Sequence, residues 1–587
     1  MKGLFSTLAT VWRIASPYFS SEDRWTARIL LAAVIAIELS IVGITVLLNA
    51  WNANFYNALQ DKNWDAFVYQ LGYFCVLAAL FIVLAVYQLY LNQWLQIRWR
   101  RWLTQRYIDN WLLGANHYRM QLLGDAADNP DQRIADDIKF FIDGSSSGAS
   151  SGILTLGLGL LNSIVTLGSF VVILWTLSAT APLHIFGSVW NIPGYLVWAA
   201  LLYAILGTVL THLIGRPLVA LNFQQQHFEA DFRFNLVRVR ENSEQIALLQ
   251  GESAEDTRLS GSFGRIAANW MLIMKRTKRL TFLTAGYGQV STVFPFIVGS
   301  PAYFAGAVQL GGLMQTASAF GSVQNALSFF INVYRGLAEW RAVIERLDGF
   351  DRSVAAAKAV ATTPPVIAVT RGDTTAIAFK DLAVRLPNGA PLVIAIGVTI
   401  ALGDKVLVNG PSGAGKSTLF RALAGIWPFG SGSIVVPANA KVMMLPQRPY
   451  FPIAPLAAAV AYPAEPGHYD SAKVAEIIAA VGLPALAARI DEEAHWNRML
   501  SLGEQQRLGL ARAILHAPDY LFLDEATASL DEPSEAALYD LLAQRLAAST
   551  IVSIGHRATL AAFHKRRLAF NRDGDHFALH EAAVTPV

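Results

Sequence analysis

The residues best suited to chemistry form a glycine-rich run at 410–417, which reads Gly-Pro-Ser-Gly-Ala-Gly-Lys-Ser. It matches the pattern G-x-x-x-x-G-K-[ST], and it lies between an apolar strand candidate at 406–408 and a helix candidate. Glycines let such a loop fold so tightly that successive backbone N–H groups surround phosphate oxygens, and the helix N-terminus adds its positive dipole end. The sequence therefore predicts a nucleotide-binding loop.

Two side chains of this loop have specific expected roles. Lys416 is expected to reach the β- and γ-phosphates, and the Ser417 hydroxyl is expected to bind Mg²⁺. The remaining expected ATP contacts of the loop are Gly410, Pro411, Ser412, Gly413, Ala414, Gly415 and Thr418. The alternative is a glycine turn that happens to precede Lys-Ser, and the flanking strand and helix candidates disfavour it.

An acidic pair follows a second apolar run, at 520–523, which is typical of a buried strand. Asp524 is placed to hold Mg²⁺, and Glu525 is placed to polarise the attacking water as general base. Taken alone, the pair could equally be a strand that ends in a helix-capping aspartate.

Two further side chains complete the expected site. Gln447 follows the strand-like run 442–445 and can bridge the metal, the water and the membrane part. His556 follows the strand candidate 550–554 and can contact the γ-phosphate. A surface glutamine and a hydrogen-bonded histidine are the ordinary alternatives. The order of all these residues after the phosphate loop instead predicts one ATPase site, with Glu525, His556 and Gln447 catalytic and Ser417, Asp524 and Gln447 on the metal.

A helix candidate begins at Leu500-Ser501-Leu502-Gly503-Glu504, shortly before the acidic pair. This run resembles the Leu-Ser-Gly-Gly-Gln signature of the ABC transporter superfamily, with Leu502 in place of the first glycine. The resemblance extends over the whole chain and implies six spans fused to one ATPase domain. It further implies a homodimer in which Ser501, Gly503 and Glu504 contact the nucleotide of the partner subunit, with Asp531 in the loop that joins the two ATP sites. The aromatic residue that usually stacks on adenine should fall near Leu386, which leaves that contact open.

Shorter motifs narrow the resemblance. Residues 48–51 and 55–60 look like the first-span motif of the SbmA/BacA-like transporters. Residues 129–134, 445–450 and 555–557 are similar to that group and to subfamily D, the peroxisomal fatty-acyl transporters. The resemblance implies a bacterial half-transporter with its own ATPase, whose relatives are implicated in uptake of antimicrobial-type peptides and other hydrophilic compounds, cobalamin among them.

The composition places this site beside a membrane. Hydrophobic residues make up 54% of the 587 residues and charged residues 15%, and the mean hydropathy is +0.38. These values are too apolar for an ordinary soluble protein. The net charge of +3 is small, so nothing suggests nucleic acid as a partner. Cys75 is the only cysteine, which excludes an intrachain disulfide, and its apolar surroundings predict burial.

Six apolar segments have about the twenty residues that a bilayer crossing needs, and lipid is their expected partner. They lie at about 29–50, 69–91, 153–177, 192–214, 282–308 and 312–338. The long loops after spans two and four are rich in arginine and lysine, whereas the other three loops carry only Lys62. By the positive-inside rule, these two loops, the ATPase domain and both termini are cytoplasmic, and the resemblance implies the bacterial inner membrane.

Loops of this length without helices would be unusual, so we expect the membrane helices to continue into the cytoplasm. Within these loops, residues 129–134 and 240–247 could be contact helices for the soluble domain or solvated turns. Asn129 is expected to cap a helix that starts at Pro130.

The predicted fold class is therefore a membrane α-helical domain with six transmembrane helices of the ABC exporter type, followed by a C-terminal α/β P-loop ATPase domain. The expected domains are an interfacial N-terminal helix (1–28), the transmembrane domain (29–340), a linker (341–371) and the ATPase domain (372–587).

Two features of the spans bear on the cargo. Glu38 is an acidic residue well inside span one, where it is either paired across helices or a contact for cargo or protons. Polar residues recur at steps of three and four along span six: Gln315, Ser318, Ser322, Asn325, Ser328 and Asn332. They predict a polar, uncharged cavity and a hydrophilic cargo; the alternative is hydrogen bonding between helices. Three functions stay open: an importer of peptides or hydrophilic solutes, an exporter or fatty-acyl transporter, and an ATP-gated regulator that moves nothing.

Overall fold

The computed structural model describes residues 2–124, 129–144, 152–180, 183–185, 188–190 and 192–582. Contacts within the chain divide it into two units. The helical unit comprises Met1–Ile108 and Asn129–Phe350, and the ATPase unit comprises Asp109–Asp128 and Asp351–Val587. A piece of the first long loop thus belongs with the ATPase fold. The domain boundaries at 28, 340 and 371 stay predictions.

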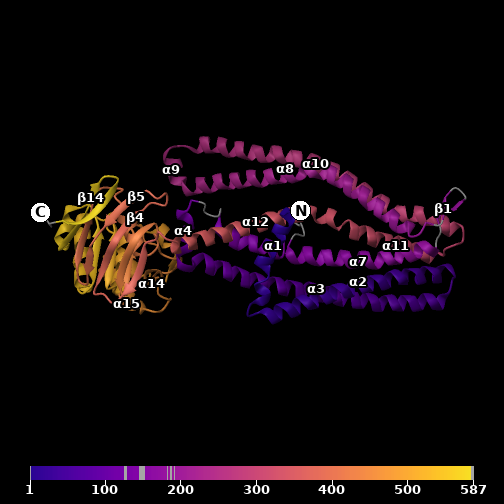
Figure 1. Cartoon of the computed structure of the whole chain (residues 1–587), viewed down its shortest axis with the longest axis horizontal. Helices are drawn as coiled ribbons and strands as arrows, with labels where there is room; N and C mark the ends of the chain where they lie inside the picture. Colours follow the sequence, from indigo (N-terminus) through magenta and orange to yellow (C-terminus); the bar gives the residue numbers. More distant parts are fainter. Residues whose placement is uncertain are drawn as a thin grey trace. The chain divides into compact units, whose positions relative to one another are not determined.

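Long helices form the helical unit (Figure 1). They are α1 (Lys2–Ala15), α2 (Arg24–Gln60), α3 (Trp64–Leu112), α7 (Ile153–Thr180), α8 (Tyr195–Glu241), α10 (Glu252–Phe304), α11 (Leu310–Leu327) and the first part of α12 (Phe329–Thr362). Helices α3, α8 and α10 are far longer than a bilayer crossing requires. That these helices continue beyond the bilayer into the cytoplasm stays a prediction. Figure 1 also shows α8 and α10 running side by side, joined by α9 at one end.

Short elements connect these helices. They are η1 (Tyr18–Ser20), η2 (Leu113–Ala115), α4 (Asn116–Leu122), α5 (Pro130–Gln132), the π-helical turn η3 (Arg133–Asp137), α6 (Ile138–Ile142), β1 (Leu183–Ile185), β2 (Ser188–Trp190) and α9 (Ser243–Leu248). Pro130 is the first residue of α5, as predicted, but the Asn129 side chain makes no capping hydrogen bond. The backbone of Asn129 is left-handed, with φ of 55°, which asparagine tolerates better than most residues.

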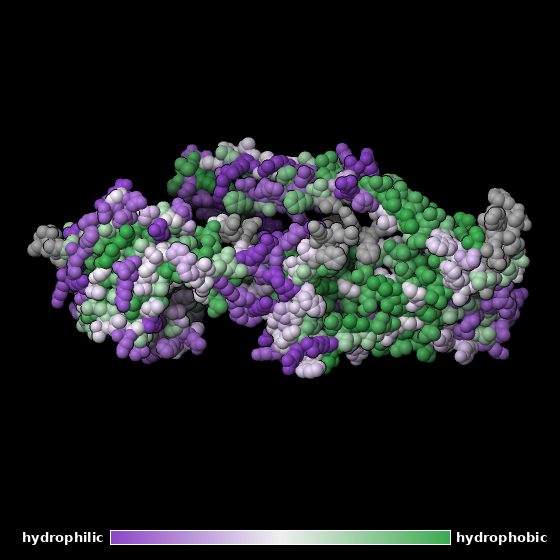
Figure 2. All heavy atoms as spheres, in the orientation of Figure 1, coloured by the Kyte–Doolittle hydropathy of each residue, from purple (hydrophilic) through white to green (hydrophobic). Residues whose placement is uncertain are grey.

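Four of the described helices are long and apolar enough to cross a membrane: Arg24–Gln60, Trp64–Leu122, Ile153–Ala179 and Tyr195–Glu241. Predicted spans five and six fall in α10 and in α11 with the start of α12, which carry more small and polar residues. Figure 2 shows apolar side chains gathered in one band over the helical unit. The prediction that Cys75 is buried is wrong. It is exposed on α3 beside the exposed Val76, because lipid accommodates apolar side chains as well as protein does.

One mixed sheet lies at the centre of the ATPase unit, in the order β3-β8-β4-β5-β15-β14-β7-β13-β12-β9 with β6 beside β4. Its strands are β3 (Ala368–Gly372), β4 (Ala376–Arg385), β5 (Pro391–Ala395), β6 (Thr399–Ala401), β7 (Lys405–Asn409), β8 (Gly430–Pro437), β9 (Val442–Leu445), β12 (Tyr520–Asp524), β13 (Thr550–Ile554), β14 (Arg566–Asp573) and β15 (His576–Ala582). The neighbours β14, β7, β13, β12 and β9 are all parallel, whereas β4 pairs antiparallel with β5, β6 and β8. The predicted parallel sheet is therefore found in the half that carries the motifs.

Helices cover this sheet. They are α13 (Lys416–Leu423), α14 (Leu456–Ala461), α15 (Ser471–Ala480), α16 (Pro484–Ala487), α17 (Trp496–Met499), α18 (Leu502–His516), α19 (Glu532–Arg545) and η4 (Ala558–Phe563), with the small hairpin of β10 (Ala454–Pro455) and β11 (Glu493–Ala494). Side chains of β12 alternate between two cores, because successive residues of a strand point to opposite faces. Leu521 and Leu523 enter one core, and Tyr520 and Phe522 enter the other. Burial of each such side chain contributes about 1.5–3 kcal/mol.

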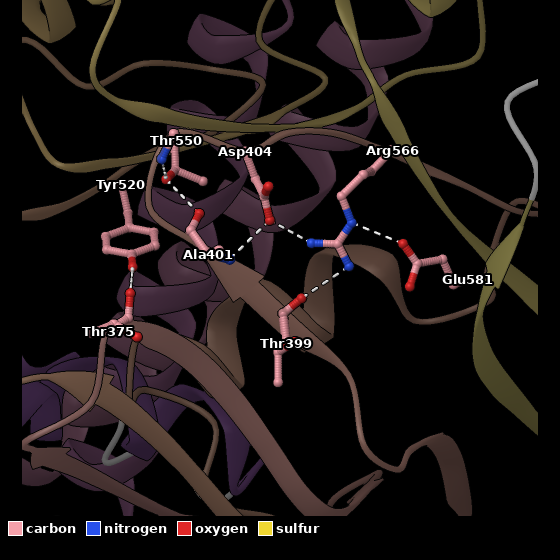
Figure 3. Close-up of polar contacts among 9 residues, drawn as sticks. Thr375, Thr399, Ala401, Asp404, Tyr520, Thr550, Arg566 and Glu581 are labelled. Carbon is pink, nitrogen blue, oxygen red and sulfur yellow. Dashed lines mark hydrogen bonds and ion pairs between the residues drawn. The ribbon is translucent and has the colours of Figure 1, made fainter.

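Polar contacts fix the turn that leads into β7 (Figure 3). Arg566 pairs with Asp404, donates from Nε to Glu581 at 2.8 Å and from Nη2 to the Thr399 carbonyl at 3.2 Å. The Ala401 N–H donates to Asp404 at 2.8 Å, and the Thr550 hydroxyl donates to the Ala401 carbonyl at 2.9 Å. These bonds hold together strands that lie apart in the sequence and so fix the start of the strand before the phosphate loop.

The part of the first long loop that packs on the ATPase fold is α4. Leu122 lies against the core that contains Phe420, and Arg119 Nη2 donates to the Gly425 carbonyl at 3.2 Å. Helix α4 of this loop thus belongs with the ATPase unit. Residues 129–134 belong to the helical unit, and their role as a contact helix for the soluble domain stays a prediction, as does that of residues 240–247.

Candidate functional site

Four neighbouring parallel strands bring the predicted residues to one edge of the sheet. In spatial order these strands are β7, β13, β12 and β9. Each is followed by part of the site: the phosphate loop, His556, the pair Asp524–Glu525, and Gln447. Ligands of open α/β sheets bind outside the carboxyl ends of the strands, so this edge is the expected nucleotide site.

The phosphate loop has the backbone that its glycines require. Gly413 and Gly415 have φ of 79° and 91°, a region that other residues rarely adopt. A Cβ atom on Gly415 would lie only 2.6 Å from the Val393 side chain. The Lys416 ammonium donates to the carbonyls of Gly410 and Pro411, at 2.8 and 2.9 Å, and so spans the loop. Burial lowers the pKa of Lys416, whereas the charges of Glu525 and Asp524 raise it.

Other loop residues differ in accessibility. Pro411, Ser412 and Gly413 are exposed, Ala414 is buried, and Ser417 and Thr418 are half-buried at the start of α13. Ser412 and Gly413, whose N–H groups precede the helix N-terminus, are thus open to an anionic ligand, which the arrangement of dipoles favours.

Ser417 and Asp524 are brought together as predicted for a metal site. The Ser417 hydroxyl donates to Asp524 Oδ1 at 2.7 Å. Burial raises the pKa of Asp524, and the hydrogen bond from Ser417 lowers it. A hydroxyl beside a carboxylate is an oxygen donor set that suits Mg²⁺, which usually takes few protein ligands and completes its shell with substrate phosphates and water. Gln447, the third predicted ligand, is exposed at the end of β9.

Glu525 and His556 also lie together. Glu525 Oε1 is 3.4 Å from His556 Nε2, and their side chains are 30% and 53% exposed. The backbone of Glu525 has φ of 52°, an uncommon conformation for a residue with a side chain, and its N–H donates to the Ile554 carbonyl at 3.2 Å. A carboxylate that water can reach thus stands beside an imidazole at the edge of the site.

The signature run begins α18 as predicted. The Ser501 hydroxyl accepts from the Glu504 N–H at 3.3 Å, and Glu504 Oε2 accepts from the Ser501 N–H at 2.9 Å, which makes a capping box. A Cβ atom on Gly503 would lie 3.4 Å from the Leu530 side chain, so the run lies against the loop before Asp531. Ser501 and Asp531 are exposed, and their contact with nucleotide on a partner subunit stays a prediction.

Two further residues bear on the site. Arg557, which the sequence indicates only as part of a motif, donates to the carbonyls of Leu530 at 2.6 Å and Ala528 at 3.3 Å, and so holds the loop before Asp531. Leu386 is half-buried against the core that contains Val393. An aliphatic side chain therefore occupies the position where the resemblance expects an aromatic residue.

The polar residues of the spans have definite neighbours. Glu38 is 7% exposed, and its carboxylate accepts from Asn162 Nδ2 of α7 at 2.5 Å and from the Gln88 amide of α3. Pairing across helices, one of the two alternatives, is thus present. On α11, Gln315, Ser318 and Ser322 are half-buried and Asn325 is exposed, whereas Ala319 and Val323 on another side of the helix are fully buried. Ser328, between α11 and α12, is buried, and the side chain of Asn332 lies outside the described part.

Two family models match this chain. One, described as ABC transporter transmembrane region 2, matches residues 14–304, and one described as ABC transporter matches residues 394–528. The chain is 35% identical to the inner membrane ABC transporter ATP-binding protein YddA of Escherichia coli over 93% of its length and 94% of that protein. It is 32% identical to the chloroplastic ABC transporter D family member 2 of Arabidopsis thaliana, over 96% of this chain and 86% of the relative.

More distant matches cover nearly the whole chain as well. The lysosomal cobalamin transporter ABCD4 of Homo sapiens is 25% identical over 94% of this chain and 92% of that protein. Among solved structures, a bacterial Atm1-family ABC exporter with ATP bound superposes with a TM-score of 0.69 and 18% identity, over 94% of both chains. This last likeness concerns the fold alone.

Proposed function

The chain belongs to the ABC transporters, in the group that includes the D family, and on that basis we propose that it imports peptides or other hydrophilic solutes as a homodimer. Membership of this family makes it a multi-pass membrane protein that binds ATP and couples ATP hydrolysis to transport. The proposal adds four points: the class of cargo, the inward direction of transport, the identity of the two subunits and the cytoplasmic location of the ATPase unit.

The proposed hydrolytic mechanism assigns each group at the sheet edge a task. The phosphate loop and Lys416 bind the phosphates, and Ser417 with Asp524 would hold Mg²⁺. Bound Mg²⁺ would neutralise charge that develops on the phosphates. Glu525 orients the attacking water and accepts its proton, and His556, 3.4 Å away, contacts the γ-phosphate.

The half-transporter organisation implies dimerisation, and we propose that the two chains are identical. Ser501, Gly503 and Glu504 of one subunit would then complete the ATP site of the other. Exposure of Ser501 and Asp531 in the single chain supports this assignment. The relative YddA is an inner membrane protein, which supports a bacterial inner membrane with the ATPase unit and both termini in the cytoplasm.

The observation that carries the cargo class is the polar side of α11. Gln315, Ser318, Ser322 and Asn325 are amides and hydroxyls that are not fully buried in the chain. In a bilayer a polar side must meet other helices or water. The Ser322 hydroxyl already donates to the Ser318 carbonyl at 3.1 Å. A hydrophilic cargo can pair with the amides of Gln315 and Asn325, whereas an acyl chain would leave each amide unsatisfied at a cost of about 1–3 kcal/mol. The distant relative named as a cobalamin transporter also supports a hydrophilic cargo.

The experiment places single cysteines at Ser318, Ser322 and Asn325 in a Cys75→Ser background. A membrane-impermeant thiol reagent should label them in right-side-out cells and block uptake of a labelled peptide. A cysteine at Ala319, which is fully buried on α11, is the matched control and should not react. Equal labelling of all four positions would contradict a polar cavity.

Fatty-acyl transport is the main competing function. The resemblance to subfamily D implies it, and a D family member of Arabidopsis thaliana is 32% identical to this chain. The purified chain in liposomes separates the two. Stimulation of ATP hydrolysis by peptides or cobalamin, but not by acyl-CoA, is the expected result. Stimulation by acyl-CoA alone would reject the proposed cargo while leaving the ATPase site intact.

A further inference from the structure

One side chain of α18 contacts two loops of the ATP site at once, one of them at two points. Gln506 is 1% exposed, and its carboxamide Nε2 donates to the carbonyl of Gln447 at 3.0 Å and to that of Glu525 at 3.5 Å. Its Oε1 accepts from the Ser529 N–H at 3.0 Å. Both ends of the amide are therefore used, and all three partners are backbone groups.

Each of these backbone groups belongs to a loop with a task in hydrolysis. Gln447 follows β9, Glu525 follows β12, and Ser529 lies in the loop that continues to Asp531. Glu525 and Ser529 therefore belong to one loop, between β12 and α19, and Gln447 belongs to a second loop from a separate part of the sequence. The left-handed backbone of Glu525 costs free energy unless neighbouring contacts hold it, and the bond from Gln506 to its carbonyl is one such contact.

The preceding residue, Gln505, provides an internal comparison. It is also buried, at 8% exposure, and also uses both ends of its amide. Its Nε2 donates to the carbonyls of Asn497 at 3.1 Å and Leu500 at 2.8 Å, and its Oε1 accepts from Asn497 Nδ2 at 3.0 Å. These bonds stay within the segment just before α18. Two adjacent glutamines are thus both buried and both fully hydrogen-bonded, but their hydrogen-bond partners lie in different segments.

We propose that Gln506 is a positioning residue for ATP hydrolysis. It holds the backbones of Gln447, Glu525 and Ser529 in place, so that the loop after β9 and the loop that carries the water-activating carboxylate are aligned when nucleotide is bound. A displacement of about 1 Å in catalytic geometry can lower a rate by about 100-fold, so a side chain that fixes two catalytic loops can have a large effect on the rate.

The test compares Gln506→Met with Gln505→Met in the purified full-length protein, with ATP hydrolysis as the assay. Methionine has nearly the same length but neither donates nor accepts strongly. We expect Gln506→Met to lower kcat by about 10- to 100-fold and to change KM by less than about three-fold, because the phosphate loop is not among the contacts of Gln506. Gln505→Met should lose a similar amount in thermal unfolding midpoint but less than about three-fold in kcat.

A second variant, Gln506→Glu, adds a readout that a merely structural role would not change. An ionised carboxylate cannot donate to the two carbonyls, whereas a protonated carboxyl can donate one hydrogen bond and still accept from Ser529. Burial raises the pKa of such a carboxyl, so protonation should begin near neutral pH. The kcat of this variant relative to the natural protein should rise as pH is lowered from about 8 to about 6. The relative kcat of Gln506→Met should stay flat.

Three results would overturn the proposal: a kcat of Gln506→Met within about three-fold of the natural protein, equal losses in the Met variants of Gln505 and Gln506, or a pH-independent deficit in Gln506→Glu. If Gln506→Met fails to fold, the pH profile of Gln506→Glu decides alone. The assay contains no cargo, so its outcome is independent of the proposed cargo and direction of transport.

Discussion

Two kinds of contact satisfy the buried polar groups in the two units of the chain. In the ATPase unit, Gln506 bonds to backbone groups of two loops, and Arg512 donates to the carbonyls of Val460, Ala459 and Tyr450 at 2.9–3.2 Å. The buried carboxylate Glu535 of this unit accepts instead from the side chains of Thr527 and Arg557, at 2.5 and 3.3 Å. In the helical unit the two buried carboxylates, Glu38 and Asp137, bond to side chains of neighbouring elements.

Asp137 is the stronger case on the helical side. It is 1% exposed, and its carboxylate accepts from Arg133 Nη1 at 2.7 Å and from Arg346 Nε and Nη2 at 2.9 and 2.6 Å. This pairing connects η3, in the second half of the first long loop, to α12. Glu38, inside a predicted span, accepts from neutral amides instead. Neutral donors avoid placing additional charged groups in the membrane, where each is costly.

The two kinds of contact respond differently to movement. A bond from side chain to backbone fixes the path of a loop, because the carbonyl cannot leave without moving the chain. A bond between two side chains can be exchanged for another when helices slide past each other. The alignment of catalytic loops is served by the first kind, as at Gln506, and the movement of helices in a transport cycle is compatible with the second, as at Asp137 and Glu38.

The largest effect should come from a substitution in the catalytic site of the ATPase unit. We expect Glu525→Gln to bind ATP but to lower its hydrolysis by at least about 100-fold, because only the water-activating group is lost. The measurement is phosphate release together with nucleotide binding by the purified protein. Glu492→Gln, an exposed carboxylate paired with Arg489, is the control and should hydrolyse ATP normally. Hydrolysis by Glu525→Gln near the natural rate would refute its role as general base.

The next largest effect should come from the buried ion pairs of Asp137 in the helical unit. Asp137→Asn leaves two guanidinium groups facing each other without a counter-charge, which should lower the stability of the helical unit by about 3–5 kcal/mol. The measurement is thermal unfolding in detergent. Glu345→Gln breaks the exposed pair with Arg341 on the same helix and should change stability by less than about 1 kcal/mol. Equal effects of the two substitutions would remove the distinction between buried and exposed pairs.

Glu38→Gln should have a smaller effect. A glutamine can rotate its amide and still pair with Gln88 and Asn162, so we expect a loss of about 1 kcal/mol in stability and retained transport. Transport of labelled peptide at several pH values is the measurement. Loss of transport, or of its pH dependence, with unchanged stability would favour the alternative that Glu38 contacts cargo or protons.

The smallest effect concerns His564 in the ATPase unit. Its Nδ1 is 2.7 Å from the Leu560 carbonyl and its Nε2 is 2.9 Å from the Ser553 hydroxyl; burial lowers its pKa. A histidine with a lowered pKa contributes stability above its unfolded pKa of about 6.5 and loses it as pH falls toward the folded value. The unfolding midpoint should therefore fall with acidification below about pH 6.5, and less steeply in His564→Gln. Exposed His580 is the control site, and a similar change of slope in His580→Gln would contradict this assignment.

Much of the ATPase fold could be predicted from sequence, because its motifs are local. The strand before the phosphate loop and the strand before Asp524 were each identifiable from an apolar run beside a polar cluster. Tertiary partners were not predictable in the same way. The contact of Gln506 with Gln447 and the pairing of Asp137 with Arg346 join residues far apart in the chain. No local sequence pattern indicates which of several arginines or backbone groups will contact a given side chain. The packing of α4 on the ATPase fold is a contact of the same kind, because Leu122 and Arg119 meet residues near 420–425.

The inclusion of residues 109–128 in the ATPase unit matters for anyone who expresses fragments of the gene. A fragment that starts at Asp351 would contain the whole sheet but would lack the partners of Lys358 and Gly425, because Asn110 and Arg119 would be missing. It would also expose the apolar surface that Leu122 covers. Such a fragment should be prone to self-association, and a synthetic peptide of residues 109–128 should restore its solubility.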